Sequence, residues 1–485
     1  MLFNSYIFIL IFLPITLIGY YLIGKHATQG NILSKWWLIL TSLFFYGYWN
    51  ISYLPIILSS ILINYFLSGK IQSLQNQNIK RNFFYLGLLF NLALLGYFKY
   101  KNFFMDNLNF IFGSDFHFTH IVLPLGISFF TLQQIAYLVD AYEGLAKHVE
   151  FHKYALFVSF FPQLIAGPIV HYQSVMPQFE ETDKMKVHSS NIALGIFVFV
   201  IGLSKKVLLA DTFSVWANEG FNDTEIFHFF MAWGTSLSYT MQLYFDFSGY
   251  SDMAIGLGLL FNIKLPKNFN SPFLARNIID FWTKWHMTLS QFITTYIFTP
   301  ILRSMPKFAF KYSMLSIFLT MCIAGLWHGA AWTFVFYGAL HGLVIVINHM
   351  MKKRKIKLPK FLAVFLTFQF INIVFTIFRA EKLETAFAIF KGMFGFTYFQ
   401  IPKGLIPNQT VVNLGAKLGS YMNNDENFNL ILLIISLFIV FKTKNSMKLM
   451  EEFKPSKKLA LWTSFLFVLC LLGLNRVTDF IYFNF

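Results

Sequence analysis

The sequence predicts an all-α polytopic membrane protein with about 11–13 transmembrane or re-entrant helices. Its composition is 56% hydrophobic and 12% charged, with a mean hydropathy of +0.57, which no ordinary soluble domain shows. Apolar tracts at residues 5–24, 191–210 and 362–378 approach the roughly 20 residues that cross a bilayer core. Basic residues occupy short loops between such tracts, so the net charge of +16 indicates membrane topology, not nucleic-acid binding.

The amino-terminal part, residues 1–115, is predicted to hold four spans near residues 5–24, 36–49, 52–67 and 83–98. The first tract lacks a small-residue cleavage signature and resembles a retained span more than a signal peptide. Lys99 and Lys101 follow the fourth span directly. They predict that this helix continues as an amphipathic segment at the membrane interface.

The middle part, residues 120–350, carries most of the unusual polar sequence. Apolar tracts at residues 122–140, 154–170 and 190–209 are each interrupted by a polar or flexible cluster, as expected where a segment lines a cavity. Residues 265–273 are too polar and too rich in turn formers for a span. Residues 278–298 have helical propensity but carry several charged or polar side chains, so a re-entrant or interfacial segment is predicted.

The carboxyl-terminal part, residues 360–485, follows the strongest basic run of the chain, KKRKIKLPK at 352–360. The positive-inside rule places this run and residues 442–458 in the cytoplasm, and residues 401–427 and the carboxyl terminus outside. The sequence shows no appended soluble domain, so residues 1–485 are predicted to form one integral membrane domain. Cys322 and Cys470 lie in apolar runs, which favours neither a disulfide framework nor a metal site.

His328 is the first candidate functional residue because it lies in a long apolar tract, 321–342, beside Trp327 and several glycines. An ionisable side chain at membrane depth costs roughly 2.5 kcal/mol or more and usually faces a cavity. In one continuous helix, His341 would lie about 20 Å further on and on a different face, so His286 is the better partner. A structural, hydrogen-bonded role remains an alternative for His286 and His341.

Asp246 and Asp252 lie among aromatic and aliphatic residues, so each needs a hydrogen bond, a counter-ion or a proton. The expected partners come from the same part of the chain: Ser248, Tyr250, Arg276 and Lys284. Structural roles are favoured for both carboxylates. Gly256 and Gly258 follow no predicted strand, and no phosphate-binding loop or hydrolase motif occurs elsewhere, so a nucleotide-binding fold is not indicated.

Four ordered motifs resemble the membrane-bound O-acyltransferase family, in its bacterial polysaccharide branch: YFDFSGYSDMAIGLG, NFNSPF, FWTKWHMTLSQF and GLWHGAAWTFVFYGALHG. The resemblance implies a ring of helices around a central funnel. His328 matches the family's catalytic histidine, His286 its second important histidine, and His341 a recurring one. The supporting candidates within these motifs are Trp327, Asp246, Tyr250, Asn268 and Trp285. Residues 293–307 read ITTYIFTPILRSMPK where relatives carry a motif like LRDYLYIPLGGNR, so details of donor, acceptor or partner differ.

The resemblance implies acetyl transfer from cytoplasmic acetyl-CoA to hydroxyls of an extracytoplasmic polysaccharide, either exopolysaccharide or peptidoglycan, by a multi-pass protein of the bacterial inner membrane. It implies contact with membrane lipids, no bound cofactor or metal, and a periplasmic partner of the SGNH acetyltransferase or esterase-like type. The ordinary pKa of histidine, about 6.5, suits His328 as a general base or transient carrier, with His286 orienting it or stabilising an oxyanion. The alternatives are D-alanyl transfer to teichoic acid from a carrier-protein thioester, and a non-enzymatic channel or transporter.

Overall fold

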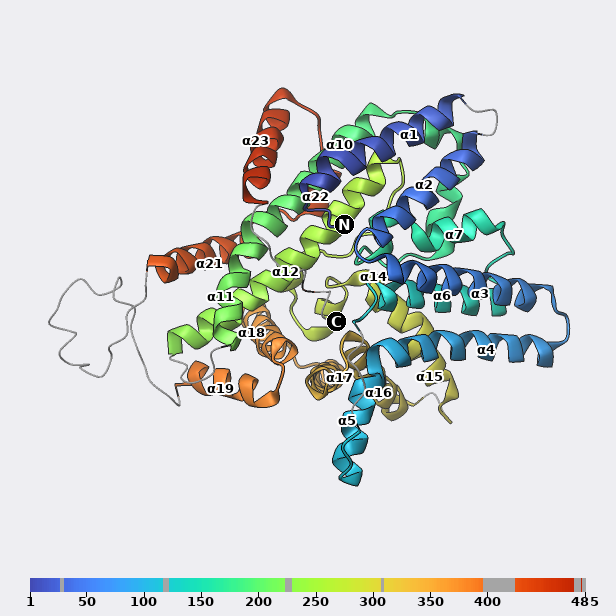
Figure 1. Ribbon diagram of the computed structural model, residues 1–485. Coiled ribbons are helices and arrows are strands. Elements are labelled where there is room, and N and C mark those ends of the chain that lie inside the picture. The colour runs from blue at the N-terminus through green and yellow to red at the C-terminus, as the bar shows by residue number, and fades with distance from the viewer. Residues whose placement is uncertain are drawn as a thin grey trace.

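The computed structural model describes residues 1–26, 30–116, 122–222, 229–306, 309–395, 424–474 and 481, and in these ranges the regular structure is entirely helical. Most of the segment predicted to lie outside the membrane, 401–427, falls beyond the described residues. The all-α class is therefore confirmed. Long helices cross one another at large angles. Two of them, α16 (Phe310–His328) and α17 (Trp332–Lys353), are seen almost end-on in Figure 1, whereas α3 (Leu54–Ser73), α4 (Gln77–Leu95) and α6 (Ile127–Tyr142) lie in the plane of the view.

Helices cover all four predicted amino-terminal spans, but the helix over the predicted span 36–49 is not among the stretches that are long and apolar enough to cross a membrane. Their bounds are η1 (Phe8–Phe12), α1 (Leu13–His26), α2 (Gly30–Gly47), η2 (Ile51–Tyr53), α3 (Leu54–Ser73), α4 (Gln77–Leu95), η3 (Gly96–Tyr100) and α5 (Lys101–Phe112). The π-helix η3 joins α4 to α5, which projects from the body of the molecule (Figure 1). Phe104, Phe110 and Phe112 on α5 are exposed, as expected for an amphipathic helix at a membrane interface.

The middle of the chain surrounds one long helix. The elements are α6 (Ile127–Tyr142), α7 (Phe151–Ser159), α8 (Phe161–Leu164), α9 (Tyr172–Val175), η4 (Met176–Phe179), η5 (Thr182–Met185), α10 (Ser189–Ser204), η6 (Lys205–Ala210), α11 (Asp211–Asn222) and α12 (Phe229–Leu260). The tract at 154–170 is interrupted, as predicted: Pro162 and Gly167 divide it into the short helices α7 and α8 and a buried loop.

The α12 helix is buried along most of its length and packs against α10 (Figure 1). Glycines allow the close approach: a Cβ added to Gly202 would lie 2.5 Å from the carbonyl oxygen of Gly249. A Cβ on Gly256 would lie 2.6 Å from the backbone nitrogen of Phe199. Gly256 therefore serves helix packing.

The last third of the chain begins with short helices and ends with long ones. The bounds are η7 (Pro272–Leu274), α13 (Ile278–Trp282), α14 (Met287–Ile293), η8 (Thr294–Phe298), α15 (Thr299–Ser304), α16 (Phe310–His328), α17 (Trp332–Lys353), α18 (Lys360–Arg379), α19 (Leu383–Met393), α21 (Asn424–Lys442), α22 (Ser446–Glu451) and α23 (Lys457–Gly473). Residues 265–273 form no spanning helix, as predicted, and residues 278–298 are broken at residues 283–286.

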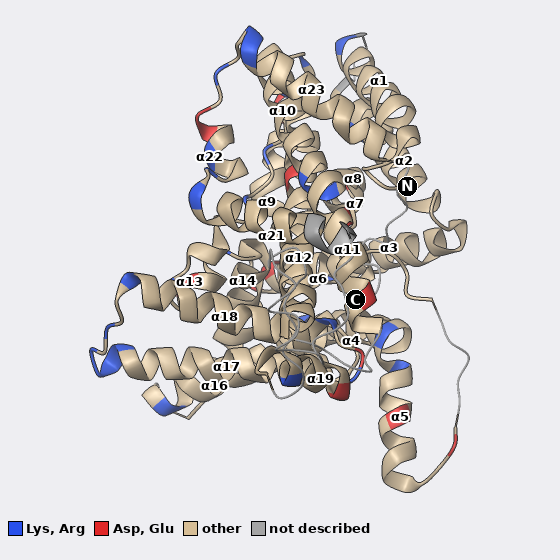
Figure 2. Ribbon diagram, turned by 90° about the vertical axis from the view of Figure 1, so that its left-hand side faces the viewer, with Lys and Arg blue, Asp and Glu red and all other residues tan. Residues whose placement is uncertain are grey.

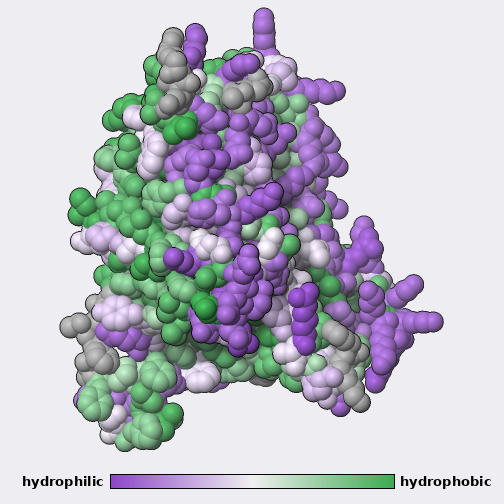
Figure 3. Space-filling model, turned by 90° about the vertical axis from the view of Figure 1, so that its right-hand side faces the viewer, coloured by the Kyte–Doolittle hydropathy of each residue, from purple (hydrophilic) through white to green (hydrophobic). Residues whose placement is uncertain are grey.

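Seven helical stretches in the described part of the chain are long and apolar enough to cross a membrane: Phe8–Lys25, Ile51–Ser73, Gln77–Phe112, Ser189–Asn222, Phe310–His328, Trp332–Lys353 and Lys360–Arg379. On the face drawn in Figure 3, hydrophobic residues cover much of one side and hydrophilic residues gather along the other. The protein is thus a polytopic membrane protein. Its arrangement around a central funnel stays a prediction.

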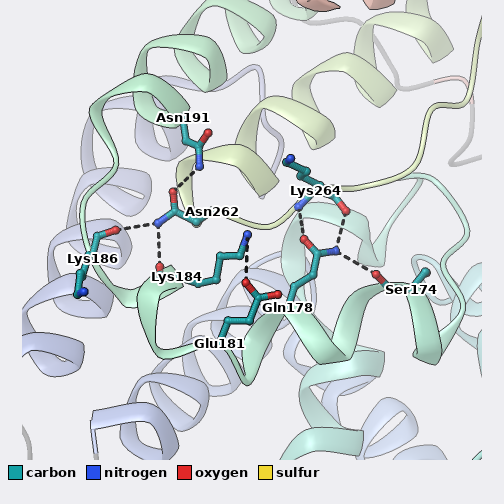
Figure 4. Close-up of polar contacts among 8 residues, drawn as sticks. All are labelled: Ser174, Gln178, Glu181, Lys184, Lys186, Asn191, Asn262 and Lys264. Atoms are coloured by element: carbon teal, nitrogen blue, oxygen red, sulfur yellow. Dashed lines mark hydrogen bonds and ion pairs between the residues drawn. The ribbon is translucent and has the colours of Figure 1, made fainter.

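Asn262 fixes the turn that leads from α12 into the loop at 265–273 (Figure 4). Its φ of 62° is left-handed, a conformation that asparagine tolerates better than most residues. Its side-chain nitrogen donates to the carbonyl oxygens of Lys184 and Lys186, each at 2.8 Å, while its oxygen accepts from Asn191 at 2.9 Å. Gln178 holds the next residues by bonding both the N–H and the carbonyl of Lys264. These hydrogen bonds therefore hold the start of the loop at 265–273 in one position.

The helices α16 and α17 form an antiparallel pair that is closed by a stripe of glycines. A Cβ on Gly325 would lie 2.3 Å from the carbonyl oxygen of Phe334, and one on Gly338 would lie 2.2 Å from that of Met321. The sequence analysis associated the glycines near His328 with the approach of a backbone or ligand. For Gly325 and Gly338 the approaching group is the backbone of the neighbouring helix.

Replacing Gly338 with alanine should destabilise the protein by about 1–3 kcal/mol, because the added methyl group forces the two helices apart. The measurement is the midpoint of thermal aggregation of the detergent-solubilised protein. Gly96→Ala is the control, since no atom lies within 4 Å of a Cβ at Gly96. Equal midpoints for the two variants would contradict the close packing.

Candidate functional site

Three buried histidines lie around one aromatic cluster. His328 is the last residue of α16, His341 lies in α17, and His286 directly precedes α14; their exposed fractions are 5%, 0% and 0%. The ring of Tyr337 lies 6.0 Å from that of His328 and 4.6 Å from that of His341. The structure thus brings His328 and His341 into one cluster.

The assumption of one continuous helix from His328 to His341 is wrong. Gly329 and Ala331 are extended, with φ of −160° and −152°, and α17 returns along α16. His341 is therefore not carried 20 Å away along a helix axis. It contacts the opposite side of the cluster through Tyr337.

His286 is held by the loop at 265–273. Its φ of 45° is left-handed, and its Nδ1 lies 3.1 Å from Oδ1 of Asn268. That oxygen also accepts from the N–H and hydroxyl of Thr288, at 3.3 and 2.9 Å, while the Asn268 amide donates to Ser251. An amide oxygen only accepts, so the ring hydrogen of His286 is on Nδ1 and the lone pair is on Nε2. That Nε2 is buried without a hydrogen-bond partner among the described residues.

Burial lowers the pKa of His286, which lies between the spanning helices, well below its usual range. The nearby His328 acts on the pKa in the same direction, by repulsion between the two rings when protonated. The described side-chain contacts of His286 are with Asn268 and Phe247 and include no hydrogen bond or ring contact with His328, so the pairing of the two histidines stays a prediction. His286 remains neutral near neutral pH.

In His341 the ring hydrogen lies on the other nitrogen than in His286. Trp282 donates its indole N–H to Nδ1 of His341 at 3.3 Å, so the ring hydrogen of His341 is on Nε2. This Nε2 also has no hydrogen-bond partner within the described structure. The rings of Phe281 and Phe370, 6.4 and 5.4 Å away, pack around it.

His328 lies where α16 ends. Its ring packs against Trp327, at 5.0 Å, and Phe378, at 5.4 Å, and its Nδ1 has no hydrogen-bond partner among the described residues. Each of the three histidines thus presents one ring nitrogen that no group in the described ranges satisfies. Buried polar atoms without partners are uncommon and call for an explanation, such as a catalytic role.

Lys99 is a site residue that the sequence analysis missed, because it interpreted this charge only as an interfacial one. Lys99 lies in η3. Its ammonium group donates to the carbonyl oxygens of Trp327 and His328, the latter at 3.1 Å, and it also donates to the hydroxyl of Ser128 at 3.3 Å. A helix leaves its last carbonyls unpaired, and a cation there is favourable. π-Helical turns such as η3 are frequent at functional sites, but this turn is visible only in the structure, so no motif in the sequence marked Lys99.

Lys99→Met should lower acyl transfer roughly tenfold or more, since about 1.5–3 kcal/mol is typical of hydrogen bonds to charged groups. Protein abundance should stay close to normal, because the change affects the end of one helix. The measurement is acyl transfer per amount of membrane protein. Lys99→Arg should restore part of the activity, which a lost packing contact would not explain. Lys101→Met, two residues away, is the control and should remain active.

The other supporting candidates pack against aromatic neighbours, and their predicted roles stay predictions. Trp327 packs on Phe129 at 5.7 Å, Trp285 stacks on Phe281 at 5.6 Å, and Tyr250 stacks on Phe3 at 4.7 Å. Asn268 is the one of the five whose described contacts include a hydrogen bond to a histidine of the cluster. Trp327 also adjoins a largely apolar cavity of about 400 Å³, to which the tract at 122–140 contributes Leu132 and Ile135. The tracts at 154–170 and 190–209 contribute no residue to its described lining, so a cavity lined by all three tracts stays a prediction.

The basic partners predicted for Asp246 and Asp252, namely Arg276 and Lys284, are wrong. Asp246 pairs with Lys206 at 2.7 Å and Asp252 with Lys205 at 2.6 Å, both from η6. Lys284 instead pairs with Asp280 at 3.0 Å. Lys206 also binds Asp211 at 2.7 Å, so this buried cation joins α11 to α12. No group of three histidine, cysteine or acidic residues that could hold a metal occurs in the described ranges.

Comparison with known proteins agrees with this architecture. A model of the membrane-bound O-acyltransferase family matches residues 56–380. The chain is 42% identical to a peptidoglycan O-acetyltransferase of Helicobacter pylori, over 100% of this chain and 98% of the relative. It is 36% identical to a probable alginate O-acetylase of Pseudomonas aeruginosa, over 87% and 80%, and 30% identical to a teichoic acid D-alanyltransferase of Bacillus subtilis, over 55% and 71%.

The fold and the match together define a membrane-embedded acyltransferase. The chain belongs to the membrane-bound O-acyltransferase family.

Proposed function

We propose that this protein moves acetyl groups from cytoplasmic acetyl-CoA across the bacterial inner membrane to hydroxyls of an extracytoplasmic polysaccharide, and that this polysaccharide is peptidoglycan. The observation that carries the proposal is the similarity to the Helicobacter pylori peptidoglycan O-acetyltransferase over the whole of both chains. The alginate relative, which aligns over most of the chain, supports acetyl as the transferred group. A periplasmic acetyltransferase or esterase-like protein of the SGNH type is the proposed partner.

The histidine cluster supports a mechanism of acyl transfer in which His328 is the base. The acceptor oxygen bonds to the thioester carbonyl carbon while its proton passes to His328. The carbon–sulfur bond then breaks, and the proton is returned to the departing thiolate. A buried ring nitrogen that no protein group occupies, as in His328, is available for such a proton.

The two other histidines are proposed to act differently because their ring hydrogens are placed differently. The free Nε2 of His286 carries a lone pair, so neutral His286 accepts a hydrogen bond, which supports an orienting role more than an oxyanion role. The free Nε2 of His341 carries a hydrogen and can donate it to a developing oxyanion. Asn268 is the proposed positioning residue for His286.

The test compares the cell envelopes of a wild-type and a deletion strain. Mild base should release ester-linked acetate from purified peptidoglycan of the wild type, and the deletion strain should lose it. Mass spectrometry of the muropeptides identifies the acetylated sugar. Acetate that persists in the deletion strain would refute the assignment of peptidoglycan.

D-Alanyl transfer to teichoic acid is the second candidate, supported by the Bacillus subtilis relative, but that alignment covers only 55% of this chain. Release of alanine in place of acetate would favour it. A channel is the third candidate. It should tolerate His328→Gln, whereas acyl transfer should not, because glutamine cannot accept and return a proton.

A further inference from the structure

A cavity of about 700 Å³ lies where α3 ends, where α4 begins and where α6 leads into the turn that follows it. The three helices pack against one another and run towards the right-hand side of Figure 1. The described lining of this cavity includes no residue of the histidine cluster. It is therefore separate from the site of acyl transfer.

The wall of the cavity is positively charged. Three lysines from three separate segments line it: Lys70, Lys80 and Lys147. The described lining contains no acidic side chain, and no ion pair of these lysines occurs in the described ranges. Lys70 lies over an aromatic ring instead, with its ammonium nitrogen 5.6 Å from the ring centre of Phe66. Cations that converge without a counter-ion favour the binding of an anion.

An apolar stripe on α3 leads to the cavity. Leu58, Leu62 and Phe66 are 39%, 54% and 57% exposed, and each lies four residues after the one before. Side chains at this spacing are neighbours on a helix surface, and Lys70 continues the series. Because Ile51–Ser73 is a candidate span, the stripe borders the acyl chains of the membrane. Phe66 belongs both to the stripe and to the lining, so a lipid chain on the stripe places its headgroup at the cavity.

The position of α4 assigns the cavity to one side of the membrane. Lys80 lies near the start of the candidate span Gln77–Phe112, and α5 forms the other end of that span. Figure 2 shows α5 at the lower right and the basic turn between α17 and α18 at the left edge. The start of α4 therefore lies on the side of the basic turn, which the positive-inside rule places in the cytoplasm.

We propose that this cavity binds the phosphate headgroup of an anionic glycerophospholipid of the cytoplasmic leaflet, with one acyl chain along the stripe of α3. Basic pockets between spanning helices on the cytoplasmic side suit such headgroups. Lysines that only mark topology need not converge, whereas these three meet at one cavity beside a lipid-facing stripe. A free phosphate ester shares the headgroup chemistry, and the test separates the two.

The test measures lipid binding to the full-length, detergent-solubilised protein by native mass spectrometry. The wild type should bind phosphatidylglycerol about tenfold or more tightly than zwitterionic phosphatidylcholine. In the double variant Lys70→Gln and Lys147→Gln, the affinity for phosphatidylglycerol should fall about tenfold or more, because charge-assisted bonds to the phosphate are lost. The control is the double variant Lys454→Gln and Lys457→Gln, which removes two lysines that are equally classed as exposed. It should bind as the wild type does.

Gly69→Leu provides a second test that leaves every charge in place. Gly69 lines the cavity, and outside its own helix a Cβ at this position would meet only the ring of His148, at 3.2 Å. A leucine there fills part of the cavity and should also weaken the binding of phosphatidylglycerol. If the double lysine variant is not recovered as a monodisperse protein, Gly69→Leu decides the question.

Unchanged affinity for phosphatidylglycerol in the double lysine variant would overturn the inference, and so would unchanged affinity in Gly69→Leu. Equal binding of the two lipids by the wild type would overturn it too. Glycerol 3-phosphate carries the phosphate ester without acyl chains. If it displaces phosphatidylglycerol at millimolar concentration, the cavity is a site for a free phosphate ester and the lipid assignment fails.

Discussion

Replacing His328 with alanine should reduce acetyl transfer by roughly 10²- to 10⁴-fold, the range expected when a general acid–base is removed. His328 is 5% exposed and its Nδ1 lacks a hydrogen-bond partner among the described residues, so the substitution removes a proton acceptor and breaks no hydrogen bond of its side chain. The measurement is base-released acetate from the envelope, normalised to the amount of the protein in membranes. Because the substitution breaks no described hydrogen bond of the side chain, protein abundance should stay near that of the wild type.

His349→Ala is the matched control for this experiment. His349 lies on α17, as His341 does, but outside the aromatic cluster and only partly buried. This variant should retain normal acetylation. Equal acetate in the His328→Ala strain and the wild type, with both proteins present, would remove His328 from the mechanism.

Replacing Lys206 with methionine should destabilise the protein by about 3–5 kcal/mol, because it leaves two buried carboxylates without their counter-ion. Lys206 binds Asp211 and Asp246, both at 2.7 Å, and all three side chains are at most 4% exposed. Asp246 also accepts a hydrogen bond from the backbone N–H of Ile481, so the substitution should weaken the contact with this residue as well. The measurement is the thermal midpoint of the detergent-solubilised protein, followed by size-exclusion chromatography.

Lys264→Met is the control, because Lys264 is exposed and only its backbone is hydrogen-bonded in the described contacts. Adding Asp246→Asn to Lys206→Met should recover part of the lost stability, since it removes one of the uncompensated charges. A midpoint for Lys206→Met equal to that of the wild type would show that the ion pairs contribute nothing net to stability.

The amino-terminal spans could be predicted from the sequence because each is a continuous apolar tract between basic loops, a signal that depends on local composition alone. His328 and His286 could also be found, because an ionisable residue in an apolar tract is costly wherever the tract folds. The break after His328 could not be predicted. Residues 329–331 read Gly-Ala-Ala, without proline or a polar cluster, and only the return of α17 onto the glycines of α16 favours the turn.

The counter-ions could not be predicted either. Lys205 lies 47 residues before Asp252, and the two meet only because η6 crosses α12. Lys99 is 229 residues from His328 and binds its backbone carbonyl, a group that every residue possesses and that no motif marks. Contacts of this kind depend on how helices cross, which residue patterns within one helix do not encode.

The opposite placement of hydrogen on His286 and His341 has a consequence for the whole catalytic cycle. One ring offers an N–H and the other a lone pair, while in the proposed mechanism His328 receives the proton of the acceptor and returns it to the thiolate, so no proton has to come from bulk water. Acetyl exchange between a thiol and an alcohol releases no net proton. A pocket with such complementary imidazoles could therefore operate while sealed from both aqueous compartments, and the membrane would keep its ion gradient during each turnover.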